Sequence, residues 1–155
     1  MANPLKFSAL GTFTTAIAGA ASGISLKNLA NGGRKLGAAI DLTGASNRQI
    51  WSNWELLVDP ASAPGNGAPV ELYFICAPDG TNYEYGDDST DPPFSAWAAT
   101  FYLQGTANQH RIDVKHIRLP NCIFKPLVRN NSGQAFANIN DVNILSYESF
   151  TLDYP

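Results

Sequence analysis

Charged residues are scarce in this chain, and their scarcity limits the partners that it could bind. Asp, Glu, Lys and Arg make up 15% of the 155 residues, whereas about a quarter is usual in soluble proteins. Lys and Arg form no run and the formal net charge is −3, which argues against a nucleic-acid binder that depends on phosphate contacts. A surface with so few charges is typical of a protein that neighbouring subunits partly cover.

Cysteine and histidine are equally rare, with two residues of each. Cys76 and Cys122 both lie in strand-like runs, and two cysteines make a poor disulfide framework for a chain of this length. We expect both thiols to be reduced and buried, with a disulfide between them as the less favoured alternative. His110 and His116 would be about 20 Å apart on one strand, so they cannot share a metal ion without a sharp bend. The sequence therefore predicts no metal site and no cofactor.

Catalytic and targeting signatures are also missing. The chain contains no nucleophile elbow, no phosphate-binding loop, no dinucleotide-binding glycine motif and no zinc-protease motif, so we predict that it is not an enzyme. No stretch approaches the roughly 18–20 apolar residues of a membrane helix, and Ser, Gly and Thr interrupt the start of the chain, where a signal peptide needs an unbroken apolar centre. We therefore expect neither membrane insertion nor secretion. Asn130-Asn131-Ser132 fits the glycosylation pattern, which matters only in a secreted eukaryotic protein.

What the sequence does contain is a repeated period of two. Apolar residues alternate with polar ones in several runs, and clusters rich in Gly, Pro and Asn separate the runs. The runs lie at 34–42, 48–59, 69–77, 97–104, 110–120, 121–130 and 141–154. Strands between such turns indicate an all-β sandwich or barrel, and no segment has an amphipathic helical stripe with caps. We predict an all-β fold, an antiparallel β-sandwich in the form of a jelly roll.

Three details of the pattern predict local geometry. Leu36 and Ile40 have the same parity, so we expect both side chains on one face of a strand. After Val114 the apolar phase shifts to Ile117, which predicts a bulge or a bend. Pro126 lacks an N–H group, so it favours an edge strand or a bulge.

The first residues differ from the rest, and we divide the chain into an N-terminal arm (1–33) and a β-sandwich domain (34–155). The arm is rich in Ala, Gly, Thr and Ser and keeps no period for long, so an extended arm and a poorly ordered tail both fit it. Its larger apolar side chains share no face, but each could bury against a partner. We predict contact with a shell or a neighbouring subunit through Leu5, Phe7, Leu10, Phe13 and Ile17.

One acidic segment, residues 79–93 ("DGTNYEYGDDSTDPP"), holds five acidic residues and no basic one. Its oxygens could bind calcium, but their spacing does not match an EF-hand loop. Asp and Gly in this arrangement are more typical of turns. We predict an exposed loop at the tip or outer edge of the sandwich, whose charge discourages pairing of sheet edges; a weak cation site is the alternative.

Aromatic side chains offer one further means of binding. Seven of them could form a sugar-stacking platform on a sandwich, although core packing or a subunit interface accounts for most such residues. The seven are Trp51, Trp54, Tyr73, Tyr83, Tyr85, Trp97 and Tyr102.

Two stretches carry a resemblance to a known family. The acidic segment is followed by "HIRLPNCIFKPLVRNNSGQAFA", in which a Leu-Pro turn leads into a strand and a polar Gly-Gln-Ala turn follows. Over residues from about 69 to 145 these features resemble small structural proteins of tailed bacteriophages, in particular a capsid cement, or decoration, protein of a cyanobacterial phage. The resemblance implies a jelly-roll-like β-sandwich that forms homotrimers and stabilises the outside of an icosahedral head.

The same resemblance implies a partner and a location. The partner would be the major capsid protein, and the protein would be part of the virion, on the capsid surface, after assembly in the cytoplasm of a bacterial host. We expect no nucleic acid and no membrane among its partners. A carbohydrate-binding β-sandwich of a phage tail fibre or baseplate is the rival hypothesis, because it would share the low charge and the lack of catalytic motifs.

Overall fold

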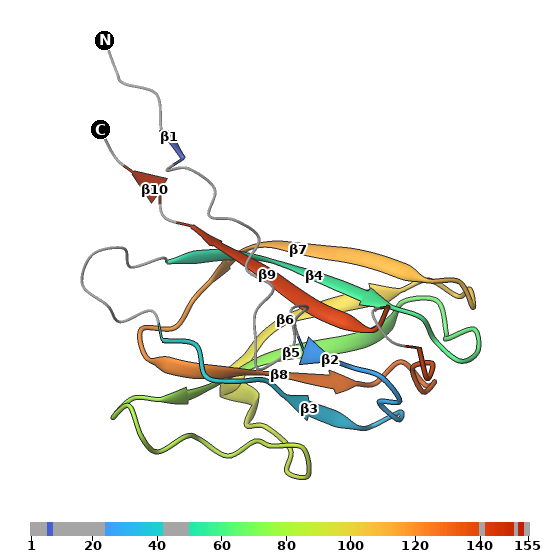
Figure 1. Cartoon of the computed structure of the whole chain (residues 1–155), viewed down its shortest axis with the longest axis horizontal. Coiled ribbons are helices and arrows are strands. Elements are labelled where there is room, and N and C mark those ends of the chain that lie inside the picture. The colour runs from blue at the N-terminus through green and yellow to red at the C-terminus, as the bar shows by residue number, and fades with distance from the viewer. Residues whose placement is uncertain (1–5, 8–23, 42–49, 140–141, 151, 154–155) are drawn as a thin grey trace.

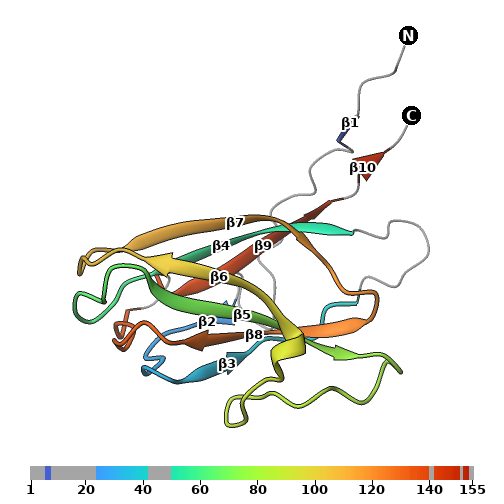
Figure 2. The ribbon, with the colours of Figure 1, turned by 180° about the vertical axis from the view of Figure 1, so that it is seen from behind.

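A computed structural model describes residues 6–7, 24–41, 50–139, 142–150 and 152–153. Two antiparallel sheets of four strands each face one another as a sandwich (Figures 1 and 2). Within the described ranges there is no α-helix, and the only helical element is a 3-10 turn, η1 (Phe94–Ala96). The strands are β1 (Lys6–Phe7), β2 (Ile24–Ser25), β3 (Arg34–Leu36), β4 (Trp51–Val58), β5 (Ala68–Ala77), β6 (Trp97–Leu103), β7 (His110–Arg118), β8 (Ile123–Asn130), β9 (Ile144–Phe150) and β10 (Leu152–Asp153).

The strand order is that of a jelly roll. One sheet, the β4 sheet, has the order β2-β9-β4-β7, and the other, the β5 sheet, has the order β3-β8-β5-β6. Early strands therefore pair with late ones in nested fashion, β2 with β9 and β3 with β8, around the inner pairs β4 with β7 and β5 with β6. Two nested sets of antiparallel strands split between two sheets define this fold. The predicted all-β sandwich is confirmed.

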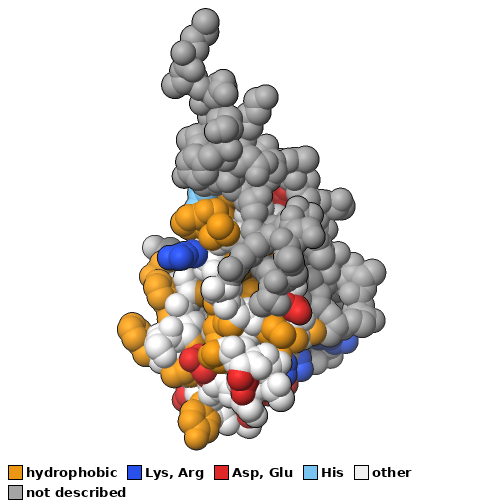
Figure 3. Space-filling model, turned by 90° about the vertical axis from the view of Figure 1, so that its left-hand side faces the viewer, with side chains coloured by type: hydrophobic (Ala, Val, Ile, Leu, Met, Phe, Trp, Pro, Cys, Tyr) orange, Lys and Arg blue, Asp and Glu red, His pale blue; other side chains and the backbone are white. Residues whose placement is uncertain are grey.

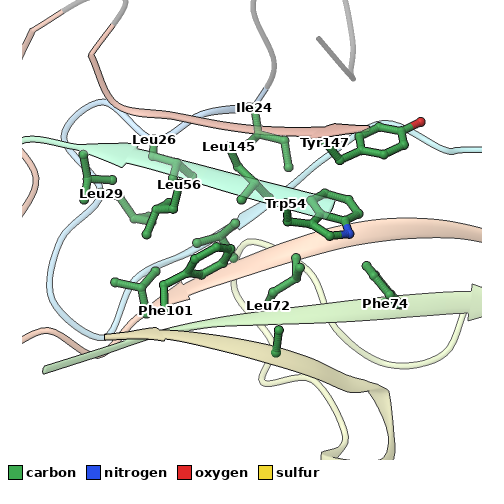
Figure 4. Packing of buried hydrophobic residues seen from close by; sticks show 14 of the residues in the cluster. Ile24, Leu26, Leu29, Trp54, Leu56, Leu72, Phe74, Phe101, Leu145 and Tyr147 are labelled. Atoms are coloured by element: carbon green, nitrogen blue, oxygen red, sulfur yellow. The ribbon is translucent and has the colours of Figure 1, made fainter. Parts of the chain in front are cut away.

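The core fills the space between the sheets with alternate side chains of each strand. Trp54 is fully buried in it, stacked on Tyr147 at 4.7 Å between ring centroids and tilted against Phe74 at 5.4 Å (Figure 4). Other fully buried members include Leu56, Val58, Val70, Leu72, Phe101, Phe124, Val128 and Leu145. In β4, β5 and β6 these inward positions follow the predicted alternation, because successive side chains of a strand point to opposite faces of the sheet.

The phase shift in β7 is a bulge, as predicted. Lys115 and His116 both lie opposite Asn53 of β4, where the pairing register changes by one residue. His116 has a φ of +57°, and its backbone N–H donates to Asn53 Oδ1 at 3.1 Å. The extra residue returns Ile117 to the inner face that Val114 occupies.

Pro126 lies in an interior strand and not at an edge, since β8 has β3 on one side and β5 on the other. The edge-strand prediction is therefore wrong, and the bulge alternative is correct. Gly37 N donates to Pro126 O at 2.8 Å, but Pro126 has no N–H to return a bond, and β3 ends at Leu36. A Cβ on Gly37 would lie 2.8 Å from Ile24 Cδ1 and 3.0 Å from Pro126 Cγ, so a larger residue here would require these side chains to shift.

This bulge, between Leu36 and Ile40, reverses the face of the sheet to which the following side chains point. Leu36 pairs with Leu127 and Ile40 with Phe124, so four steps along one strand match three along its neighbour. One extra residue reverses the face on which the following side chains lie. Ile40 is buried between the sheets, whereas Leu36 packs on the outer face of the β5 sheet. The prediction that these two residues share a face is wrong.

Residues 24–33, which the sequence analysis placed in the arm, belong to the sandwich. Ile24, Leu26 and Leu29 are buried in the core. Asn130, at the end of β8, fixes this segment: its side-chain nitrogen donates to the carbonyl oxygens of Leu29 at 3.0 Å and Ala30 at 3.2 Å. Asn130 is fully buried, so in the folded protein it cannot serve as a glycosylation acceptor.

Both ends of the described chain meet in a small ribbon. β1 pairs with β10, Lys6 opposite Asp153 and Phe7 opposite Leu152, and this pair lies beyond the end of the sandwich in both ribbon views (Figures 1 and 2). Of the five predicted contact residues, Phe7 is thus on β1. Leu5, Leu10, Phe13 and Ile17 lie outside the described residues.

Candidate functional site

The acidic segment is exposed, as predicted, and it lies along the outer face of the β5 sheet and reaches the outer edge at β3, not the tip of the sandwich. Basic side chains of two neighbouring strands hold it there. Arg34 Nε donates to Asp91 Oδ1 at 2.8 Å, and Arg129 approaches the same carboxylate at 3.5 Å. Lys35 Nζ binds Asp88 Oδ2 at 3.1 Å. The segment is acidic because it is matched to a basic patch on β3 and β8.

Asp88 also covers the free edge of the β5 sheet. Leu36 N, on the side of β3 that faces away from β8, donates to Asp88 Oδ1 at 2.6 Å. β3 is the last strand of its sheet, and exposed N–H groups at a sheet edge can pair with another chain. At this position the loop blocks such pairing by a hydrogen bond and not by its charge alone.

Two other carboxylates organise turns within the loop. Asp79 Oδ1 accepts hydrogen bonds from the N–H groups of Thr81 at 2.9 Å and Asn82 at 2.7 Å. Asp87 Oδ1 accepts from Ser89 N at 2.7 Å and from Thr90 N at 2.6 Å. The donors around Asn82 and Ser89 lower the pKa of each carboxyl to about 2. These bonds fit the predicted turns, and among the described residues no group of three or more Asp, Glu, His or Cys side chains could hold a metal ion.

A second apolar cluster lies under this loop, on the opposite side of the β5 sheet from the core. Its buried members are Tyr73, Ile75 and Leu127 from the sheet and Ala96 from η1. Gly86 approaches this cluster closely with a φ of +136°, and a Cβ there would lie 2.8 Å from Ile75 Cδ1. The loop is thus anchored by charges at its rim and by apolar contact at its centre.

The seven aromatic residues do not form one platform. Trp54 and Tyr73 are buried, and Trp51 and Tyr83 are half-buried. Lys125 Nζ lies 4.0 Å from the centre of the Tyr83 ring. The exposed members are Tyr85, Trp97 and Tyr102.

Phe94 is the most exposed of the large apolar residues in the described chain, with 89% of its surface accessible. Phe94 is not among the predicted binding aromatics, although it directly follows two prolines in a stretch without period-two alternation, which is a signal for an exposed position. Together with Tyr85 and Trp97, at 83% and 47%, Phe94 makes the anchored loop and its exit into β6 a stretch of exposed rings.

A pocket of about 340 Å³ opens at the end of the sandwich where β5 and β7 end and β6 begins. Figure 3 views this end of the molecule, where apolar side chains are scattered between a few charged ones. The apolar lining is Phe74, Ala96, Trp97, Leu119 and Pro120, and the polar lining is Cys76, Glu84, Ser95, Arg118 and Asn121. Trp97 Nε1 donates to Thr100 Oγ1 at 3.2 Å, which ties the indole to its own strand, β6.

The polar side chains of this pocket are not paired with one another. Within the described parts of the chain, the side chains of Glu84, Ser95, Arg118 and Asn121 make no hydrogen bond or ion pair. Their donors and acceptors therefore remain free for a bound molecule.

The two thiols are free, as predicted, but they are half-buried and not fully buried. Burial and the neighbouring Cys122 thiol raise the pKa of Cys76 to about 12. A thiol with so high a pKa is protonated at neutral pH and is a poor nucleophile. Cys76 therefore contributes to the pocket wall as a small, weakly polar group.

The histidines lie in separate surroundings. His110 is buried, with Nε2 3.1 Å from the carbonyl oxygen of Thr106. His116 is exposed, with its ring edge against Phe150 at 5.9 Å between centroids.

No family model, curated protein or solved structure matches this chain. Within the described ranges, no helix has the length and apolar character that crossing a membrane requires. The function must therefore be argued from the surfaces of this molecule.

Proposed function

We propose that this chain is a structural virion protein, a capsid cement or decoration protein that binds and stabilises the outside of an icosahedral phage head. The observation that carries the proposal is the anchored loop with its exposed rings. Tyr85, Phe94 and Trp97 sit on a segment that ion pairs and turns hold in one place. Aromatic residues dominate the energetics of protein interfaces, and a contact surface that is already ordered loses less entropy on binding.

The proposed partners are the major capsid protein and two further copies of this chain. A closed homotrimer suits the three-fold positions of a shell, and this part of the proposal rests on the family resemblance. The β1–β10 ribbon supports a contact near the chain ends, because a two-stranded ribbon alone is marginally stable in water. We propose that Leu5, Phe7, Leu10, Phe13 and Ile17 bury against the shell or a neighbouring subunit.

We propose no catalytic activity. The pKa of the Cys76 thiol is raised, the buried His110 ring contacts a backbone carbonyl, and Asp79 and Asp87 accept hydrogen bonds from their own turns. None of these groups is arranged as a nucleophile with an adjacent base, which supports a binding role.

A binding assay with heads tests the proposal. Heads of the encoding phage that lack this protein would be mixed with wild-type protein, with a Tyr85→Ala/Phe94→Ala variant and with Tyr102→Ala, an exposed aromatic outside the loop. We expect wild type and Tyr102→Ala to co-sediment with heads at hundreds of copies, and the double variant to lose most of this binding. Failure of the wild-type protein to coat heads at saturating concentration would refute the function; full coating by the double variant would refute the role of the loop.

Two further measurements test the assembly. Deleting residues 2–20 should leave a folded sandwich that no longer coats heads, because the core begins with Ile24. Sedimentation equilibrium should give a trimer at micromolar concentration. A truncated protein that coats heads fully would show that the arm is not the anchor, and a monomer would contradict the trimer independently.

A carbohydrate-binding role in a tail fibre or baseplate is the second candidate. The observation that favours it is the pocket beside Trp97, where an exposed indole adjoins four unpaired polar side chains. The exposed platform of seven aromatics that first suggested this role is reduced to this one site.

A further inference from the structure

We propose that the pocket between Trp97 and the β7–β8 connection is a saccharide-binding site that accepts a neutral sugar unit. The site shares Trp97 with the proposed head-binding surface, and its Glu84 and Ser95 lie on the same anchored loop. The inference deepens the carbohydrate-binding candidate described above and rests on it. Its volume of about 340 Å³ falls within the range of small-molecule sites, about 300–1,000 Å³.

The apolar part of the site suits the carbon face of a sugar ring. Trp97 is half exposed, and its bond to Thr100 Oγ1 keeps the indole in position. Leu119 and Pro120 continue the apolar wall. A flat ring that lines a pocket and is held by a hydrogen bond offers a large contact area at little entropic cost.

The polar part of the site suits hydroxyl groups. Glu84 can only accept hydrogen bonds and Arg118 can only donate them, while Asn121 and Ser95 can do both. A sugar hydroxyl is donor and acceptor at once, so it can satisfy each of these side chains. An apolar ligand would bury them without partners, which is costly.

The charges of the site favour a neutral ligand. Glu84 and Arg118 carry opposite charges and lie in the same pocket, and within the described ranges they form no ion pair with one another. An anionic ligand such as a nucleotide would meet the Glu84 carboxylate, and a cationic one would meet the Arg118 guanidinium. The net charge of −3 on the whole chain also disfavours phosphate groups.

Glycan-array screening followed by calorimetry with the best-binding oligosaccharide tests the proposal. We expect wild type to bind glycans that present neutral hexoses, and Trp97→Ala and Asn121→Ala each to weaken binding at least tenfold. Trp97→Phe should retain part of the affinity, because it keeps a ring in the pocket lining. Tyr102→Ala is the matched control: it removes an exposed aromatic at the other end of β6 and should leave binding unchanged.

Three results would overturn the site. They are no glycan binding by wild type, binding that Trp97→Ala and Asn121→Ala leave intact, or equal loss in Tyr102→Ala. Thermal melting of each variant controls for unfolding. Head binding by Asn121→Ala separates this site from the proposed capsid role, because we expect that variant to coat heads normally while it no longer binds glycan.

Discussion

The two apolar clusters of this protein, on opposite sides of the β5 sheet, are built in different ways. The core between the sheets is closed on both sides by strands and filled by large rings such as Trp54 and Phe101. The outer cluster around Ile75 has a sheet on one side and a loop on the other, and exposed ion pairs at Arg34 and Lys35 seal its rim. Burial supplies most of the stability of a fold, whereas exposed ion pairs contribute little. The sandwich should therefore be much more stable than the loop that it carries.

The largest difference in the free energy of unfolding should be between variants of two tryptophans, Trp54 and Trp97. Trp54→Ala removes a fully buried ring from the core and should lower the free energy of unfolding by about 3–5 kcal/mol. Trp97→Ala removes a ring that is 47% exposed and should lower it by only about 1 kcal/mol, because much less of its surface is buried. Urea unfolding followed by circular dichroism measures both. Similar losses in the two variants would mean that the exposed indole is part of the stabilising core.

A smaller effect is expected under the loop. Ile75→Ala empties the centre of the outer cluster and should cost about 2–3 kcal/mol, at the lower end for buried isoleucine, because the loop can close partly over the gap. The distinctive sign should be faster proteolysis within residues 79–96 than elsewhere. Leu56→Ala, a core variant on the other sheet, is the control and should leave the loop's relative susceptibility unchanged. Equal protection of the loop in both variants would contradict its separate stability.

Removing Asp88, whose carboxylate caps the β3 edge through Leu36 N, should have a smaller effect on stability still. Asp88→Ala removes the acceptor for Leu36 N and the partner of Lys35, and we expect a loss of about 1 kcal/mol or less. Hydrogen exchange at the Leu36 amide should accelerate. Asp88→Asn keeps a side-chain oxygen but not the charge, so it should preserve most of the protection. Unchanged exchange in Asp88→Ala would show that the cap does not form in solution.

Acid should loosen the loop at residues 79–93 before it unfolds the sandwich. The pKa values of Asp79 and Asp87 are about 2 in the fold, against an ordinary 3.8, and the pKa of Asp91 is lowered beside Arg34. A lowered pKa stabilises the fold above the ordinary value, and this contribution is lost as the pH falls toward the folded value. Between about pH 4 and pH 2, protease sensitivity of residues 79–93 should rise. A loop equally resistant at pH 6 and pH 2 would exclude these carboxylates as its anchors.

The alternation of apolar and polar residues predicted the strands well, because in a strand with one buried face the apolar residues mark the side that faces the core. The alternation in β4 and β5 identified the inward positions of Trp54 and Leu72, and the shift after Val114 identified the bulge. The same logic failed at Leu36 and Ile40. The bulge between them arises from Pro126 of another strand, and nothing in the period of residues 34–42 records it.

Contacts between residues that are far apart in the chain could not be predicted from the sequence. The acidic segment suggested a solvated loop, because its basic partners Arg34 and Arg129 are remote in the chain. Ile24 and Leu29 looked like part of an arm because short strands without alternation give no periodic signal. For the pocket, the aromatic residues suggested Trp97, but its polar neighbours come together only through the fold.

The place of β9 in its sheet has a consequence for synthesis. β9 comes last among the described sandwich strands, yet it lies inside its sheet, between β2 and β4. A ribosome must therefore release almost the whole chain before this sheet can close, and until then the edges of β2 and β4 stay open. Pairing between such distant segments is slow, and open edges in a nascent chain invite aggregation. A chain that stops before Ile144 would lack a central strand and not a peripheral one, so premature termination should yield aggregates instead of a shortened sandwich.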